Sequence, residues 1–159
     1  MNKLFTFNNE EKEYIKKEKE NHENTKSAVI EIIKFIQKKY NWVSDEHINS
    51  IAKILNITNI ELEEITTFYS QIFRKPIGKN IIRYCDSIVC YINNYKIVQK
   101  EIENILKIKP GETTKDKKFT LLPTCCLGNC DKSPVIMINN NTYTNMQPNK
   151  ISMLLNKYK

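Results

Sequence analysis

The sequence predicts a protein of mixed α and β class, with an N-terminal helical bundle in residues 1–77 followed by an α/β domain in residues 78–159. Two observations support this prediction. Before Gly78 the apolar residues recur at helical spacing, and after it short runs rich in Ile, Val and Thr alternate with one longer helical pattern. The change occurs at Pro76-Ile77-Gly78, where proline and glycine interrupt regular structure. With 159 residues, 40% of them apolar, the chain has room for one domain or two small ones.

Four helices are expected in the first part, because three of them combine a cap residue with apolar residues on one face and the fourth is a long polar stretch. Their expected places are residues 8–23, a helix that begins at Asn24 or Thr25, a helix between Ser44 and Asn56, and a helix opened by a capping box of Thr58 and Glu61.

An aromatic cluster follows Glu61 at helical spacing, and we interpret it as bundle core rather than as a binding surface. His22 and His47 lie in polar stretches far from the cysteines, so we expect both to be exposed and neither to bind a metal. The cluster consists of Phe68, Tyr69, Ile72 and Phe73.

The second part predicts the element order β-α-β-β-β-α, which is typical of a thioredoxin-like sheet. The helix is expected to run unbroken from a cap at Ser87 to Ile105, with one buried face that includes Ile88 and Ile92. The strands are expected at residues 80–84, 119–122, 135–138 and 142–146, and the last helix begins at Pro148.

Four of the five cysteines form two pairs, Cys85 with Cys90 and Cys126 with Cys130, on loops at the ends of neighbouring predicted strands. A [2Fe–2S] cluster needs four thiolates, two at each iron, and takes them from loops that the fold brings together. Zinc also binds four thiolates, but usually from the tighter spacings Cys-x2-Cys to Cys-x4-Cys. The spacing therefore favours an iron–sulfur cluster and leaves zinc open. Thioredoxin-type dithiol chemistry needs Cys-x-x-Cys, a spacing that does not occur in the sequence.

The residues around the cysteines suit a metal site. Cys90 falls in the first turn of the predicted helix, where backbone N–H groups and the helix dipole favour a thiolate. Gly128 can adopt a positive φ and let backbone N–H groups point at bridging sulfides, where a Cβ would collide. We expect Cys125 to pack against the sheet rather than bind metal, because neighbouring residues at a strand end point to opposite sides. Pro134 can enter its strand through either a cis or a trans bond.

Composition and charge make several classes of function unexpected for this chain. The formal charge is +7, but lysines are interleaved with glutamates as on solvated helix faces, so a nucleic-acid partner is not expected. The N-terminal 20 residues lack the apolar core of a signal peptide, and we expect a cytosolic chain with reduced thiols. Only three glycines are present, too few for a glycine-rich loop that would bind the phosphates of NADH or a flavin nucleotide.

Several short runs stand out around and before the cysteines: RYCDSIVC, LLPTCCLGNCDKSP, TTFYS, PIG and the pair NW that ends at Trp42. They strongly resemble the family of E subunits of bacterial NADH-quinone oxidoreductase, respiratory complex I. The resemblance covers about the whole chain. In that family a helical N-terminal part precedes a thioredoxin-like domain that holds one [2Fe–2S] cluster.

The resemblance implies a site as well as a fold. By matching position, it implies that Cys85, Cys90, Cys126 and Cys130 bind the cluster, that Cys125 lies outside the ligand set, and that this chain has no catalytic residue. The implied function is that of an electron-transfer subunit of NADH:quinone oxidoreductase, a translocase. Its cluster would exchange single electrons with the flavin mononucleotide (FMN) of a partner flavoprotein, which also binds NADH.

The resemblance also implies partners and a location. Besides the flavoprotein, other peripheral-arm subunits are expected partners. We expect a cytoplasmic location, peripheral to the inner face of the cell membrane through the complex, with no direct membrane insertion. Two alternatives share parts of the pattern: the small [2Fe–2S] subunit of a flavin-linked soluble hydrogenase or formate dehydrogenase, and a zinc-stabilised interaction or nucleic-acid module.

Overall fold

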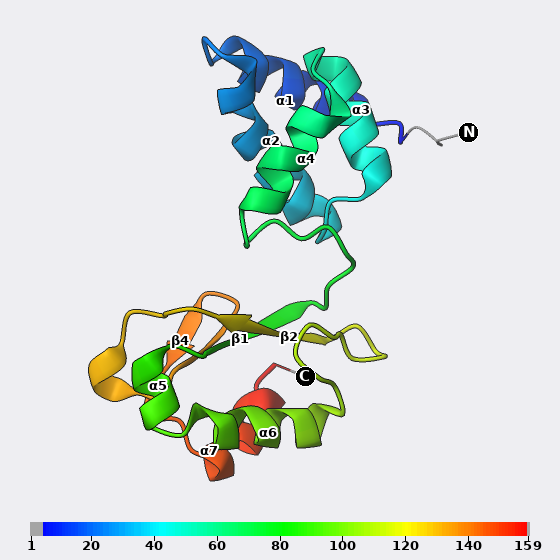
Figure 1. Ribbon diagram of the computed structural model, residues 1–159. Coiled ribbons are helices and arrows are strands. Elements are labelled where there is room, and N and C mark those ends of the chain that lie inside the picture. Colours follow the sequence, from blue (N-terminus) through cyan, green and yellow to red (C-terminus); the bar gives the residue numbers. More distant parts are fainter. Residues whose placement is uncertain (1–4, 159) are drawn as a thin grey trace. The chain divides into compact units, whose positions relative to one another are not determined.

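The computed structural model describes residues 5–158 and divides the chain into two compact units, Met1–Pro76 and Ile77–Lys159 (Figure 1). The first unit is helical, and the second combines a small mixed sheet with helices, so the predicted fold class is confirmed. Each unit has its own hydrophobic core. Among residues 5–158 no helix is both long and apolar enough to cross a bilayer.

Four helices pack around one core in the first unit, and each begins at a polar cap. The Asn24 side chain accepts a hydrogen bond from the Lys26 N–H at the start of α2. The Thr58 hydroxyl and the Glu61 carboxylate form the predicted capping box at α4. The bounds are α1 Asn9–Glu20, α2 Thr25–Tyr40, α3 Asp45–Leu55 and α4 Asn59–Phe68.

The aromatic cluster after Glu61 is not uniformly core, so that prediction is wrong for two of its residues. Phe68 is 80% exposed and Tyr69 41% exposed, whereas Ile65 and Ile72 pack against the core of this unit. The physical reason is that α4 ends at Phe68 and Tyr69 is already extended. The helical spacing therefore stops before the cluster does, and the side chains of Phe68 and Tyr69 are exposed.

The expectation that His47 is exposed is also wrong. His47 is buried, and its Nδ1 accepts a hydrogen bond from the backbone N–H of Ser44 at 3.2 Å. Its ring contacts the rings of Phe5 and Tyr40 at centroid distances of 4.4 and 4.7 Å. Burial lowers the pKa of His47, which favours the neutral ring. The capping geometry at Ser44 turns this side chain inward. His22 is half-buried, with its Nδ1 3.0 Å from a backbone oxygen.

Glu11 is a buried carboxylate that ties α1 to α2. It accepts hydrogen bonds from Tyr40 Oη at 2.5 Å and from the backbone N–H of Asn8 at 2.7 Å, and it pairs with Lys39 Nζ at 2.7 Å. Burial raises the pKa of Glu11, but the contacts with Lys39, Tyr40 and Asn8 outweigh burial, and the pKa lies below its ordinary value.

We expect the substitution Glu11→Ala to lower the free energy of unfolding by about 2 kcal/mol at neutral pH, because Tyr40 and Lys39 lose a shared buried partner. The folded-state pKa lies below the ordinary value of 4.5. The stabilisation is therefore complete above that pH and lost as pH falls through the folded-state pKa. Thermal unfolding of the full chain at several pH values measures this. The matched control is Glu10→Ala, an exposed neighbour in the same turn; equal losses for both variants would contradict the prediction.

The second unit is built on a four-stranded sheet in the order β2-β1-β3-β4. β1 is parallel to β2 and antiparallel to β3, and β4 completes an antiparallel pair with β3. Figure 1 shows α6 and α7 on the same side of this sheet, where their apolar faces close the core. The bounds are β1 Asn80–Cys85, α5 Ile88–Ile92, α6 Tyr95–Leu106, β2 Phe119–Thr124, η1 Cys130–Lys132, β3 Ile136–Ile138, β4 Asn141–Tyr143 and α7 Pro148–Asn156.

The single helix expected after Ser87 is two helices, so that prediction is wrong. Asn94 has a φ of 60° and a ψ of 41°, a left-handed conformation that separates α5 from α6. Because the helical phase breaks there, Ile88 and Ile92 are 66% and 70% exposed instead of sharing the buried face of Val98. Cys90 lies in the first turn of α5, as predicted, although α5 has only five residues. The stabilisation of a thiolate by the helix dipole stays a prediction.

Candidate metal centre

The pairing of two parallel strands brings the cysteine pairs to one edge of the sheet. β1 ends at Cys85, whose register partner on β2 is Thr124, and Cys126 follows two residues later. Asn93, just after α5, donates a hydrogen bond from Nδ2 to the Ser133 hydroxyl, 2.6 Å away, in the segment after η1. Figure 1 shows α5 beside this segment at one end of the sheet. Cys90 on α5 and the thiols of the loop after β2 therefore face the same region.

The first pair is buried. Cys85 is 2% and Cys90 1% exposed, and with Val135 they form a small apolar cluster. The Cys85 N–H donates to the Val135 carbonyl at 3.1 Å, which holds the end of β1 against the segment that enters β3. Burial raises the pKa of the Cys90 thiol to about 11, with the neighbouring Cys85 adding to the shift. Metal binding at this pair must therefore displace a firmly held proton.

The second pair, Cys126 and Cys130, is exposed, and its two sulfur atoms lie close together. The Sγ atoms of Cys126 and Cys130 are 4.0 Å apart. Their mutual contact raises the pKa of Cys130, because two thiolates at this distance repel. Between them Gly128 has a φ of 81°, and its backbone N–H donates to Cys126 Sγ at 3.4 Å. The positive φ predicted for Gly128 is confirmed.

Among the described residues nothing lies within 4 Å of the place where a Cβ on Gly128 would stand. The positive φ favours glycine at position 128, because side chains rarely adopt that conformation. The collision of a Cβ with bridging sulfides stays a prediction.

Cys125 does not pack against the sheet, contrary to our expectation. Its side chain is exposed, and its carbonyl oxygen lies 3.6 Å from Cys85 Sγ. β2 ends at Thr124, so the alternation of side chains along a strand does not extend to this residue. The bond between Ser133 and Pro134 is cis, one of the two alternatives left open by the sequence.

The donor set fits an iron–sulfur cluster. A metal ion with tetrahedral sulfur ligands at ~2.3 Å holds neighbouring sulfurs ~3.8 Å apart, close to the 4.0 Å between Cys126 and Cys130. Sulfur-only sites select iron–sulfur clusters or zinc among common metals. Among residues 5–158 the structure gathers no three His, Cys, Asp or Glu side chains around one point. It presents thiols two by two, and a cluster with two irons takes two thiolates at each iron.

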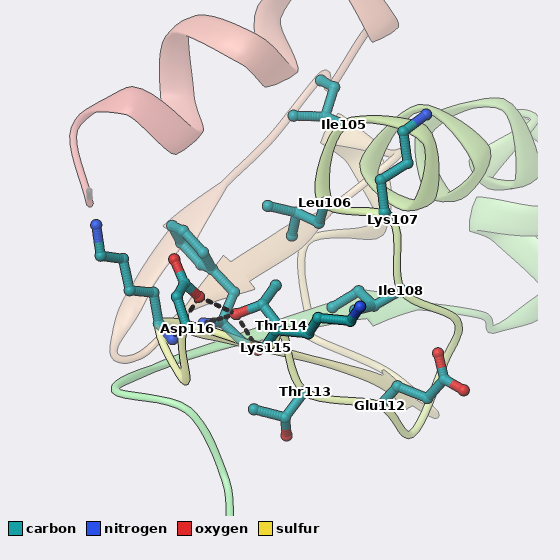
Figure 2. Close-up of a pocket in the computed structure, with 11 residues that line it drawn as sticks. Ile105, Leu106, Lys107, Ile108, Glu112, Thr113, Thr114, Lys115 and Asp116 are labelled. Atoms are coloured by element: carbon teal, nitrogen blue, oxygen red, sulfur yellow. Dashed lines mark hydrogen bonds between the residues drawn. The ribbon is translucent and has the colours of Figure 1, made fainter.

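The pocket shown in Figure 2 lies away from the cysteines. This pocket, of about 810 Å³, is formed by the end of α6 and the loop before β2, and no cysteine lines it. It lies at Phe119, the first residue of β2, whereas the cysteines follow the last. Its carboxylate Asp116 accepts hydrogen bonds from Thr114 Oγ1 at 2.5 Å and from the Lys118 N–H at 3.0 Å. The candidate metal centre is thus separate from this pocket.

Fold and thiols together define a class of protein. The sequence pattern of the thioredoxin-like [2Fe–2S] ferredoxin family matches residues 15–159, and this match confirms the predicted cofactor, a [2Fe–2S] cluster. The air-oxidized NAD+-reducing [NiFe]-hydrogenase, a crystal structure, aligns with a TM-score of 0.62 and 21% identity. The alignment covers 70% of this chain and 19% of that chain, and it shows likeness of fold alone.

Closer relatives are known from sequence. The E subunit of NADH-quinone oxidoreductase from Buchnera aphidicola subsp. Acyrthosiphon pisum (strain APS) is 56% identical over 98% of this chain and 96% of its own length. The corresponding E subunit from Escherichia coli (strain K12) is 50% identical over 94% of this chain and 90% of its own length. The chain belongs to this family, the E subunits of NADH-quinone oxidoreductase.

Proposed function

We propose that this chain is an electron-transfer subunit of NADH:quinone oxidoreductase, and that Cys85, Cys90, Cys126 and Cys130 hold its one [2Fe–2S] cluster. The observation that carries the proposal is the arrangement of the thiols in two pairs at and just after the ends of the parallel strands β1 and β2. When bound, the cluster takes up and releases one electron at a time. In this proposal the electron is exchanged with the FMN of a partner flavoprotein.

The chain's own residues shape the site in three ways. Cys85 and Cys90 lie away from water, with Val135 and Leu127 packed around them. Cys126 and Cys130 are exposed, which leaves a route for an electron between the site and a partner. The Gly128 N–H donates to the Cys126 sulfur and thereby stabilises negative charge on it.

The partner must supply the hydride chemistry. Of the three glycines, Gly111 and Gly128 lie in turns and Gly78 just before β1, so the chain has no glycine-rich loop for NADH or FMN. We therefore assign both to the flavoprotein, and we expect other peripheral-arm subunits as further partners. Through them the chain would lie on the cytoplasmic side of the membrane, peripheral to its inner face.

We assign residues 1–77 to docking on the flavoprotein and residues 78–159 to the cluster. The supporting observation is an open groove of about 420 Å³ on the helical unit. Phe68 and Tyr69 line it together with Ile30 and Ile65, and large exposed aromatic side chains are typical of protein interfaces.

The second candidate function is that of the small [2Fe–2S] subunit of a flavin-linked soluble hydrogenase or formate dehydrogenase. The fold likeness to the NAD+-reducing [NiFe]-hydrogenase favours it. The relatives from NADH-quinone oxidoreductase are 50% and 56% identical over nearly their whole length, which favours the first function more strongly. Identification of the genes next to this one separates the two.

Purified anaerobically, the chain is expected to hold about two irons and two acid-labile sulfides, because four thiolates in two pairs satisfy one [2Fe–2S] cluster. NADH alone should leave it oxidised, and NADH should reduce it once the FMN-bearing flavoprotein is added. Visible absorption of the cluster, followed during both additions, measures this. The control is the flavoprotein without FMN, which should leave the cluster oxidised. Stoichiometric zinc in place of iron, or reduction by NADH in the absence of the flavoprotein, would overturn the proposal.

A further inference from the structure

We infer that the two thiol pairs are unequal: Cys126 and Cys130 hold the iron that accepts the electron, and Cys85 and Cys90 hold the iron that stays ferric. The inference rests on the proposed ligand set and goes beyond it, since four ligands alone do not say which iron is reduced. It also assigns a positioning role to Gly128.

The first argument is burial. Cys85 and Cys90 are 2% and 1% exposed, whereas Cys126 and Cys130 are both exposed. Reduction by one electron adds one negative charge and neither forms nor breaks a bond. A charge is more costly in an apolar interior than beside water. The added charge is therefore more stable on the iron held by the exposed pair.

The second argument is the dipole that each sulfur faces. The Gly128 N–H points its positive end at Cys126 Sγ from 3.4 Å. Cys85 Sγ instead lies 3.6 Å from the carbonyl oxygen of Cys125. Once Cys85 gives up its proton to bind metal, it can no longer donate to that oxygen, and two negative atoms face each other. Both dipoles favour added charge at Cys126 over Cys85.

Gly128 is the positioning residue because its φ of 81° presents the N–H to Cys126. Alanine rarely adopts that conformation, so Gly128→Ala should turn the N–H away from the sulfur. If Cys126 binds the iron that is reduced, losing this donor should disfavour the reduced state directly.

Mössbauer spectroscopy of the 57Fe-loaded chain identifies the reduced iron. Dithionite, which is oxidised to sulfite, supplies one electron to each cluster and converts one ferric iron to ferrous. We expect Cys126→Ser, which replaces a sulfur ligand by oxygen, to change the ferrous doublet and leave the ferric one unchanged. The matched variant Cys85→Ser should do the opposite. A change confined to the ferric doublet in Cys126→Ser would overturn the inference, and this variant decides the question even if Cys85→Ser takes up no iron.

A second measurement keeps the inference testable if neither serine variant binds iron. Gly128→Ala should lower the ratio of reduced to oxidised cluster at a fixed potential by about threefold, equivalent to ~30 mV for one electron. The control is Gly111→Ala, because Gly111 also has a positive φ and open space at its Cβ position but lies before β2, away from the thiols. Equal midpoint potentials for Gly128→Ala and Gly111→Ala would overturn the role of Gly128. Wild-type protein without two irons and two sulfides would instead refute the proposed function itself.

Discussion

Replacing any one of Cys85, Cys90, Cys126 and Cys130 by alanine is expected to abolish the cluster, with the iron content falling from about two per chain to near zero. An iron left with one protein sulfur lacks the second thiolate that each iron of a [2Fe–2S] cluster needs. Among the described residues no group of three His, Cys, Asp or Glu side chains is placed to hold a metal, so no third side chain of either pair can replace it. Iron and sulfide assays with visible absorption on the four variants measure the loss.

The matched control is Cys125→Ala, which should retain the cluster. Cys125 is exposed and directly precedes Cys126 in the same loop, so its removal costs little packing. Truncation of the buried Cys85 or Cys90 should cost about 1 kcal/mol of stability, too little to unfold the domain. Circular dichroism should therefore show native structure in every variant. Loss of the cluster in Cys125→Ala, with retention in Cys126→Ala, would show that the ligand register is wrong.

Deleting residues 1–76 is expected to leave cluster assembly intact and to weaken association with the flavoprotein by at least about tenfold, or 1.4 kcal/mol. Cluster assembly should survive the deletion because each of the two units has its own hydrophobic core. The weaker association follows from the exposed side chains of Phe68 and Tyr69, which large interfaces commonly bury. Co-purification of full-length and truncated chains with the flavoprotein compares the two affinities.

A point variant sharpens this test without removing a domain. Phe68→Ser should weaken association because Phe68 is 80% exposed and lines the groove on the helical unit. Ile60→Ser is the matched control: Ile60 is 73% exposed on the same helix and does not line the groove. If the truncated chain still co-purifies stoichiometrically with the flavoprotein, the docking role assigned to the helices must be abandoned.

Much of the helical unit was predictable because local rules decide where helices begin. Ser44 and Thr58 each place a hydroxyl before an apolar pattern, and both helices begin directly after these caps. The final helix likewise starts at Pro148, where a fixed φ suits its first turn. A capping residue acts on backbone groups within four residues of it, so the local sequence is enough to predict where the helix begins.

Burial was less predictable because it depends on contacts between distant segments. His47 looks like a surface residue in its sequence, yet its ring contacts the rings of Phe5 and Tyr40, from two other segments of the chain. Phe68 looks like core by its spacing, yet the helix ends there and the ring faces outward. The spacing of apolar residues does not predict where a helix ends when no helix-terminating residue, such as glycine or proline, follows.

The sequence by itself predicted the class of this protein: the two cysteine pairs favour an iron–sulfur cluster over zinc, and the runs around them resemble the E subunits of NADH-quinone oxidoreductase. Only the tertiary structure decided that the pairs differ, with Cys85 and Cys90 buried and Cys126 and Cys130 exposed. The spacing of cysteines along the chain indicates which sulfur atoms can bind the same metal. Their exposure depends on how β1, α5 and the loop after β2 pack together, and no local pattern encodes that packing.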